Sequence, residues 1–177
     1  MRTHIIGGVL LAAALTLTAC GNGDDVGAGP TPGASRIDTV DPAEDITFGT
    51  TYTWADGLKV TVTEARIFTD FTDEEGPADP RSHQFRAKLR FTNGGDTPAD
   101  LGEVSTLVMS ANEEAAIATS GTFRNGAAPL AGSLAPGATA TKTDDAVIDR
   151  KHGRKILVVV QRAGSIAAPE FIGSIRG

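Results

Sequence analysis

The chain contains a single cysteine, Cys20, and its thiol is the side chain with the most distinctive chemistry. A lone cysteine can form neither an internal disulfide nor a structural zinc cluster built from several thiolates. Its sulfur can still be alkylated, and a thioether to a diacylglycerol turns a cysteine into a membrane anchor. The residues that precede Cys20 therefore decide what it does.

An apolar run over residues 5–19 leads up to Cys20. The run matches the roughly 7–15 residues of a signal-peptide core and is shorter than the roughly 20 that cross a bilayer as a helix. Its end resembles a lipobox, in which a branched apolar residue and two small ones precede the lipidated cysteine, here Leu17, Thr18 and Ala19. The sequence predicts a lipoprotein signal peptide over 1–19 and a diacylglycerol on Cys20, with no other cofactor. An ordinary signal peptide or a short membrane anchor is the alternative.

Hydrolytic catalysis needs a nucleophile, a base and an orienting acid that meet in one place. After the predicted leader, the only histidines of the sequence are His83 and His152. Ser82 adjoins His83, but neighbouring residues of a strand point to opposite faces, so these two cannot form a dyad there. We expect His83 at the rim of the fold and His152 in a solvated turn. We expect no enzymatic activity.

An acidic loop over residues 70–79 carries five carboxylates, those of Asp70, Asp73, Glu74, Glu75 and Asp79. Calcium prefers such oxygen ligands, but their spacing differs from that of an EF-hand loop, so no metal is assigned to them. Long loops on a rigid scaffold often carry function. A solvated loop and a cation site both remain open.

Arg86, Lys88 and Arg90 alternate with apolar residues and therefore share the outer face of one predicted strand. This basic row is a candidate site for an anionic wall polymer. It could also pair with the acidic loop or with neighbouring strands. Tyr52 and Trp54 flank the first turn, where they predict core or rim packing, with a sugar platform as the alternative.

The charge of the chain argues against several partners. Acidic residues number 22 and basic residues 16, which gives a formal net charge of -6. Removing the predicted leader deletes Arg2, so the mature balance is 15 minus 22, or -7. An acidic protein is a poor ligand for nucleic acid and gains no attraction to anionic lipid. Membrane attachment must therefore come from the acyl chains.

Residues 20–45 must hold any folded part away from the anchor. They are rich in Gly, Pro, Asp and small side chains and contain almost nothing to bury. Such a stretch cannot offset the entropy lost on ordering, so the sequence predicts a flexible linker. The pattern changes to strands and turns at about residue 46.

The clearest strand covers residues 83–92, where apolar and polar side chains alternate strictly. Residues 58–68 form another, in which the alternation slips near Glu64 and predicts a β-bulge. The run 156–160 is apolar on both faces, which places it in the middle of a sheet. Further strands are expected at 52–55, 106–111, 138–148 and 170–175, and weaker ones near 115–118 and 122–123. About seven or eight short strands predict an all-β antiparallel sandwich over 46–177.

Three segments carry a family resemblance: FGTTYTWADGLKVTV, FRAKLRFTNGGDTPADL and LAPGATATKT. Together they resemble Gram-positive bacterial lipoproteins with an immunoglobulin-like domain of unknown function. The matching motifs are Phe48-Gly49, Gly57-Leu58-Lys59-Val60, Thr92-Asn93-Gly94-Gly95 with Pro98, and Leu134-Ala135-Pro136-Gly137. The resemblance implies an extracytoplasmic immunoglobulin-like sandwich with no established chemistry. Because the Cys…Trp…Cys framework of antibody domains is missing, core packing alone must hold the two sheets together.

These observations lead to one expected function and one alternative. We expect a lipoprotein anchored on the extracytoplasmic face of the cell membrane, whose sandwich is a non-enzymatic binding module. Its partner would be a protein or a cell-wall component, and not nucleic acid. The alternative is a calcium- or small-ligand-sensing accessory subunit of an envelope complex, which would use the acidic loop.

Overall fold

The computed structural model describes residues 45–76, 78–130 and 132–177. These ranges include all of the predicted sandwich, 46–177, except Pro77 and Ala131. The predicted signal peptide over 1–19, the Leu17–Cys20 segment and all but the last residue of the predicted linker lie outside the described residues.

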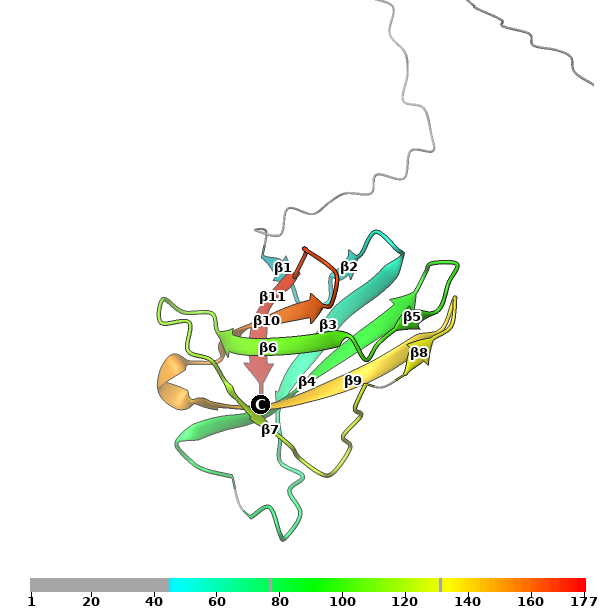
Figure 1. Ribbon diagram of the computed structural model, residues 1–177. Coiled ribbons are helices and arrows are strands. Elements are labelled where there is room, and N and C mark those ends of the chain that lie inside the picture. The colour runs from blue at the N-terminus through cyan, green and yellow to red at the C-terminus, as the bar shows by residue number, and fades with distance from the viewer. Residues whose placement is uncertain (1–44, 77, 131) are drawn as a thin grey trace, which may run out of the picture. The chain divides into compact units, whose positions relative to one another are not determined.

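The described residues form eleven strands and one 3₁₀ turn, η1 (Arg150–His152), so the all-β prediction is confirmed. Figure 1 shows the strands in two layers, with β6 passing in front. The strands are β1 (Ile46–Thr47), β2 (Thr51–Thr53), β3 (Leu58–Ile67), β4 (Ser82–Asn93), β5 (Ala99–Asp100), β6 (Val104–Ser110), β7 (Thr119–Gly121), β8 (Ser133–Leu134), β9 (Thr139–Asp149), β10 (Lys155–Arg162) and β11 (Glu170–Arg176).

The layers of this immunoglobulin-like sandwich are joined through β11. Its first residues pair with β10, and its last two, Ile175 and Arg176, pair with β3. The hydrogen-bonded order is therefore continuous: β6-β10-β11-β3-β4-β9-β7, with β1 beside β11, β2 beside β3, and a separate β5–β8 pair. Pairing is antiparallel except between β1 and β11 and between β11 and β3, which are parallel.

The core lies between the layers and follows the alternation seen in the sequence. Phe85, Leu89 and Phe91 of β4 are fully buried, as is Phe171 of β11. The pairing of β3 with β4 shifts between Val62 and Glu64, which confirms the predicted bulge. The bulge lets β3 keep apolar side chains inward on both sides of the slip. Strand β10 lies between β6 and β11, as its two-sided apolar run predicts.

Two weak strand predictions were wrong in detail. Residues 115–118 contribute only a single bridge, between Ile117 and Met109. The short strand expected at 122–123 lies instead at Thr119–Gly121, where it pairs with β9. Short segments with few apolar side chains give the periodicity too few positions to fix their ends.

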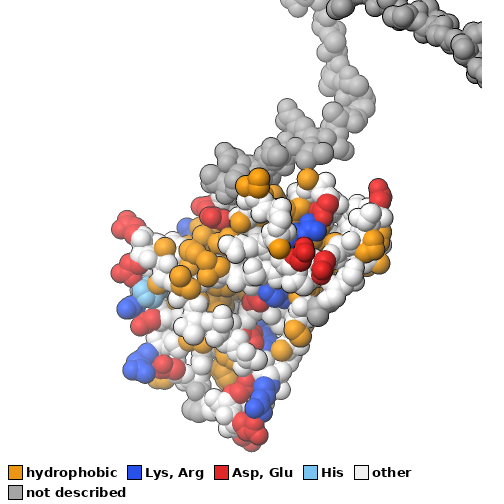
Figure 2. All heavy atoms as spheres, in the orientation of Figure 1, with side chains coloured by type: hydrophobic (Ala, Val, Ile, Leu, Met, Phe, Trp, Pro, Cys, Tyr) orange, Lys and Arg blue, Asp and Glu red, His pale blue; other side chains and the backbone are white. Residues whose placement is uncertain are grey.

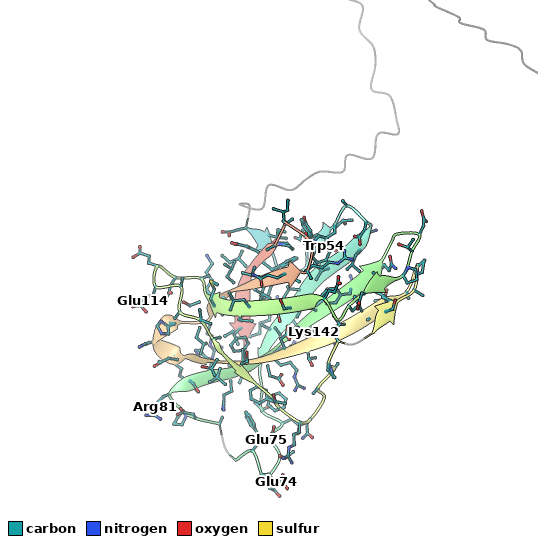
Figure 3. The ribbon with its side chains drawn as sticks, viewed as in Figure 1. Trp54, Glu74, Glu75, Arg81, Glu114 and Lys142 are labelled. Carbon is teal, nitrogen blue, oxygen red and sulfur yellow. The ribbon has the colours of Figure 1, made fainter. Side chains whose placement is uncertain are left out.

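Three polar side chains, Thr106 of β6 with Lys142 and Asp144 of β9, connect these two strands, and we call them the polar seam. Thr106 of β6 donates to Asp144 Oδ2 at 2.6 Å, and Lys142 Nζ contacts both Thr106 Oγ1 at 2.9 Å and Asp144 Oδ1 at 2.7 Å. Lys142 is labelled in Figure 3 between these strands. Inward charges at sheet edges are a known protection against edge-to-edge pairing.

Candidate functional site

Three of the five carboxylates of the acidic loop have hydrogen-bond or ion-pair partners on the protein. Glu75 accepts hydrogen bonds from the backbone N–H groups of Thr72 and Arg124, both at 2.8 Å. These bonds favour the ionised form, so the pKa of Glu75 lies below its ordinary value. The Glu75 carboxylate therefore ties the loop to the segment that follows β7.

Two other carboxylates of the loop pair with arginines. Glu74 forms an ion pair with Arg124, and Asp79 lies 3.3 Å from Arg81 Nε. Acidic and basic side chains lie next to each other at this end of the domain (Figure 2), and Figure 3 labels Glu74 and Glu75 there. The two remaining members, both outside these ion pairs, are Asp70 and Asp73. Within the described residues, no group of three or more His, Cys, Asp or Glu side chains could hold a metal ion. The geometry does not support the calcium-sensing alternative.

The basic row is divided by the structure, because Arg86 is already engaged. Its guanidinium binds Asp145 in two places, Nε to Oδ1 at 2.6 Å and Nη2 to Oδ2 at 2.9 Å. It also donates to the carbonyl oxygens of Phe123, at 2.7 Å, and Asn125. The Phe68 ring lies 4.6 Å from the guanidinium carbon. Arg86 thus pairs with the neighbouring strand β9 and offers no free face to an anion.

Lys88 and Arg90 are exposed and stand on a wider surface that the strand register assembles. Residues paired across β2, β3, β4 and β9 share one face, so Lys59 lies between Thr53 and Thr92, while Arg90 lies between Thr61 and Thr141. We call this surface the threonine–cation face. Its members are Thr51, Thr53, Lys59, Thr61, Lys88, Arg90, Thr92, Thr139, Thr141 and Thr143. Glu64 stands opposite Lys88 at the edge of this face, and its carboxylate pairs with Arg66.

A shallow groove of about 420 Å³ runs across part of this face. Thr61 forms its floor and is only 3% exposed. The hydroxyls of Thr51 and Thr61 are 2.7 Å apart, and those of Thr92 and Thr139 are 3.1 Å apart. Because each hydroxyl keeps a free lone pair after such a bond, the groove presents fixed hydroxyls beside Lys59 and Arg90. This combination suits a ligand that carries negative charge and its own hydroxyls.

Sequence reasoning missed Lys59 and the threonines as parts of this site. Each lies at an outward position of its own strand, so the alternation indicates on which face of the sheet its side chain lies. Their meeting depends on which strands are neighbours and in which register, and neither the spacing nor the composition of the chain specifies those pairings.

A second hollow, of about 330 Å³, lies between β6, β7 and β9. Its charged lining consists of Asp144 and Asp145. Asp144 is paired with Lys142 and Asp145 with Arg86, so both carboxylates are neutralised by cations of the fold itself. This hollow belongs to the polar seam and offers little to an incoming ligand.

The candidate catalytic and sugar-binding residues are all packed. His83 is at the end of β4 as expected but only 6% exposed, opposite Ile148 of β9. His152 is less exposed than expected, because only 12% of its side chain is exposed and its Nδ1 lies 2.8 Å from Glu114 Oε2. Tyr52 and Trp54 are buried in edge-to-face contact at 5.3 Å, which confirms core packing and excludes a sugar platform.

Burial of His83 makes the stability of the domain depend on pH. Burial is the main cause that lowers the pKa of His83 from its ordinary value of 6.5, followed by the charges of Arg154 and Arg150. Below pH 6.5 the unfolded chain takes up the proton more readily, so the free energy of unfolding falls as the pH drops toward the folded-state pKa. Urea unfolding at pH 7.5 and 5.5 should show a smaller loss in His83→Leu than in the wild type or in His152→Gln. An equal loss in all three proteins would remove His83 as the cause.

The described residues include no helix with the length and apolar character needed to cross a membrane. No protein-family model and no curated protein sequence matches the chain.

Three solved structures share the fold at low sequence identity. The ycdA protein of Bacillus subtilis, a "putative lipoprotein", superposes with a TM-score of 0.52 at 10% identity, over 71% of this chain and 38% of its own. The chain therefore corresponds to well under half of ycdA. The yjhA protein of Bacillus subtilis gives a TM-score of 0.51 at 13% identity, over 73% of this chain and 98% of its own. A conserved hypothetical protein of Bacillus anthracis gives 0.50 at 14% identity, over 72% and 95%. At such identities the likeness establishes the fold alone.

Proposed function

We propose that this protein is a lipoprotein anchored on the extracytoplasmic face of the cell membrane, and that its sandwich is a non-enzymatic binding module. One observation carries the anchoring: the only cysteine of the chain follows Leu17, Thr18 and Ala19 at the end of a run typical of signal peptides. In this proposal the chain belongs with the Gram-positive lipoproteins that its three segments resemble.

The physics of attachment supports a lipid rather than a charged surface. Each buried methylene of an acyl chain contributes about 0.8 kcal/mol, and two chains give stable anchoring where one does not. A chain with a formal net charge of -6 is not attracted to anionic lipid headgroups as a whole. Acylation of Cys20 therefore supplies the attachment.

The binding role is supported by the threonine–cation face. Three cations, Lys59, Lys88 and Arg90, lie on this surface. None of them takes part in an ion pair among the described residues. The histidines that catalysis would need are packed, His83 in the core and His152 against Glu114. A rigid sheet that presents fixed polar groups is suited to recognition.

Replacing Cys20 by alanine is expected to abolish lipid attachment. The variant should appear in the medium or accumulate as uncleaved precursor, whereas Thr18→Ser, which keeps a small residue before the cysteine, should stay in the membrane fraction. Cell fractionation and mass spectrometry of the N-terminus provide the measurement. An intact leader on the wild-type protein, or a mature Cys20 without fatty chains, would contradict the proposal.

A further inference from the structure

We propose that the threonine–cation face binds an extended phosphate-bearing polymer of the cell envelope, such as a polyol phosphate chain. This inference rests on the proposed binding module and names its ligand class. The charges of the face, their spacing and the hydroxyls between them support it.

The cations of the face form no ion pair, whereas six other cationic side chains of the described residues do. Six arginine and lysine side chains are paired with carboxylates: Arg66, Arg81, Arg86, Arg124, Lys142 and Arg162. Lys59, Lys88 and Arg90 have no carboxylate partner among the described residues and are exposed. On a chain with a formal net charge of -6, a group of free cations on one sheet face is a place where a negative ligand can still bind.

The spacing of the cations suits a repeating anion. Lys88 and Arg90 are two residues apart on β4, which separates them by roughly 7 Å along the strand. Lys59 stands opposite Thr92, two residues beyond Arg90, on the adjacent strand β3. The three charges therefore follow one direction across the sheet. A chain whose phosphates are separated by a short polyol unit can contact them in succession.

The threonines supply what a phosphate and a polyol both need. Their hydroxyls can donate to phosphate oxygens and accept from ligand hydroxyls, and the pairs Thr51–Thr61 and Thr92–Thr139 hold them in place. Bonds from Arg and Lys to phosphate are charge-assisted and stronger than neutral ones. The members of the face include no aromatic side chain on which a base could stack, which disfavours single-stranded nucleic acid.

The test compares two variants of equal net charge. Lys59→Gln/Arg90→Gln removes two charges from the face, and Lys155→Gln/Arg176→Gln removes two exposed charges elsewhere, on β10 and β11. The full mature chain, purified in detergent, is titrated with soluble poly(glycerol phosphate) by calorimetry. The face variant is expected to bind about tenfold more weakly, with a weaker salt dependence, while the control stays within about twofold of the wild type.

Further arms separate the sources of phosphate. Vesicles of phosphatidylglycerol carry the same phosphodiester on a lipid, and poly-glutamate carries charge without phosphate. Binding to the polymer that exceeds binding to both, and that Lys59→Arg preserves, supports the proposal. Equal loss in both double variants, equal binding of poly-glutamate, or binding to vesicles alone overturns it. Thermal unfolding confirms that each variant folds. A wild-type protein that carries lipid on Cys20 but ignores the polymer would refute this inference alone and leave the anchoring intact.

Discussion

Replacing Arg86 by alanine is expected to lower the free energy of unfolding by about 3–5 kcal/mol, the usual cost of removing one partner from a buried ion pair. Only 14% of the Arg86 side chain and 5% of the Asp145 side chain are exposed. Without Arg86, the Asp145 carboxylate would keep its charge in a poorly solvated place, with the Phe123 N–H at 2.7 Å as its remaining partner. Most of the expected cost therefore comes from leaving the Asp145 carboxylate without a neutralising cation, and less from the lost contact itself.

The expected loss includes the anchoring of two loops. The Arg86 guanidinium holds the carbonyl groups of Phe123 and Asn125 against the sheet and lies over Phe68. Phe68 stacks on Phe123 at 4.5 Å and meets Phe71 edge-to-face at 4.9 Å. The acidic loop therefore packs on the outer face through an aromatic cluster centred on one arginine. Faster amide exchange in residues 69–76 and 122–126 should accompany the loss of stability.

Arg66→Ala is the matched control for Arg86→Ala. Arg66 faces outward on the adjacent strand β3 and pairs with Glu64, but the two side chains are 66% and 32% exposed. Exposed pairs contribute about 0–1 kcal/mol, so this variant should unfold close to the wild type in urea. The double variant Arg86→Leu/Asp145→Leu should recover part of the loss, because it removes both charges together. A cost for Arg86→Ala as small as that for Arg66→Ala would show that the pair is not what holds these loops.

The same arginine shows where sequence reasoning succeeds and where it stops. The alternation along β4 correctly assigns every second side chain to the core, because the pleat alone sets that period. It places Arg86 on the outer face, which is also correct. On that face Arg86 is covered by Asp145 of β9 and by a segment near Asn125, both dozens of residues away in the chain. Local patterns carry no information about such contacts.

Charged side chains that point inward are the second feature that the sequence pattern does not predict. Lys142 and Asp144 occupy inward positions of β9, and a polar residue there weakens the alternation that would reveal the strand. Their partners are each other and Thr106, across the seam between the layers. The all-β class was predictable because many separate segments show strand patterns. The parallel pairing of β11 with β3 was not, since it joins segments from opposite ends of the domain.

The turn motifs behind the family resemblance meet in space at Asn93. Its Nδ2 donates to the carbonyl oxygens of Thr97 and Leu134, both at 2.8 Å, and its Oδ1 accepts from the Gly95 N–H at 3.0 Å. Its own backbone carbonyl accepts from the Gly137 N–H at 2.7 Å. Asn93 therefore joins the turn after β4 to the turn before β9, and it is 1% exposed. An asparagine at this place in the motif has a physical reason, because its amide both donates and accepts.

Replacing Asn93 by leucine, of similar volume, is expected to cost about 3–5 kcal/mol, at the upper end for a single substitution. Three backbone groups would lose their partner, and a buried unsatisfied group costs about 1–3 kcal/mol. Asn93→Asp should be at least as harmful at neutral pH, since a carboxylate would face the carbonyl groups of Thr97 and Leu134. Urea unfolding followed by the fluorescence of Trp54, the only tryptophan, gives the measurement. The exposed Gln161 of β10, whose side-chain amide has no hydrogen bond within the described residues, is the control, and Gln161→Ala should cost less than about 1 kcal/mol. Equal effects at the two positions would mean that the turns hold without this amide.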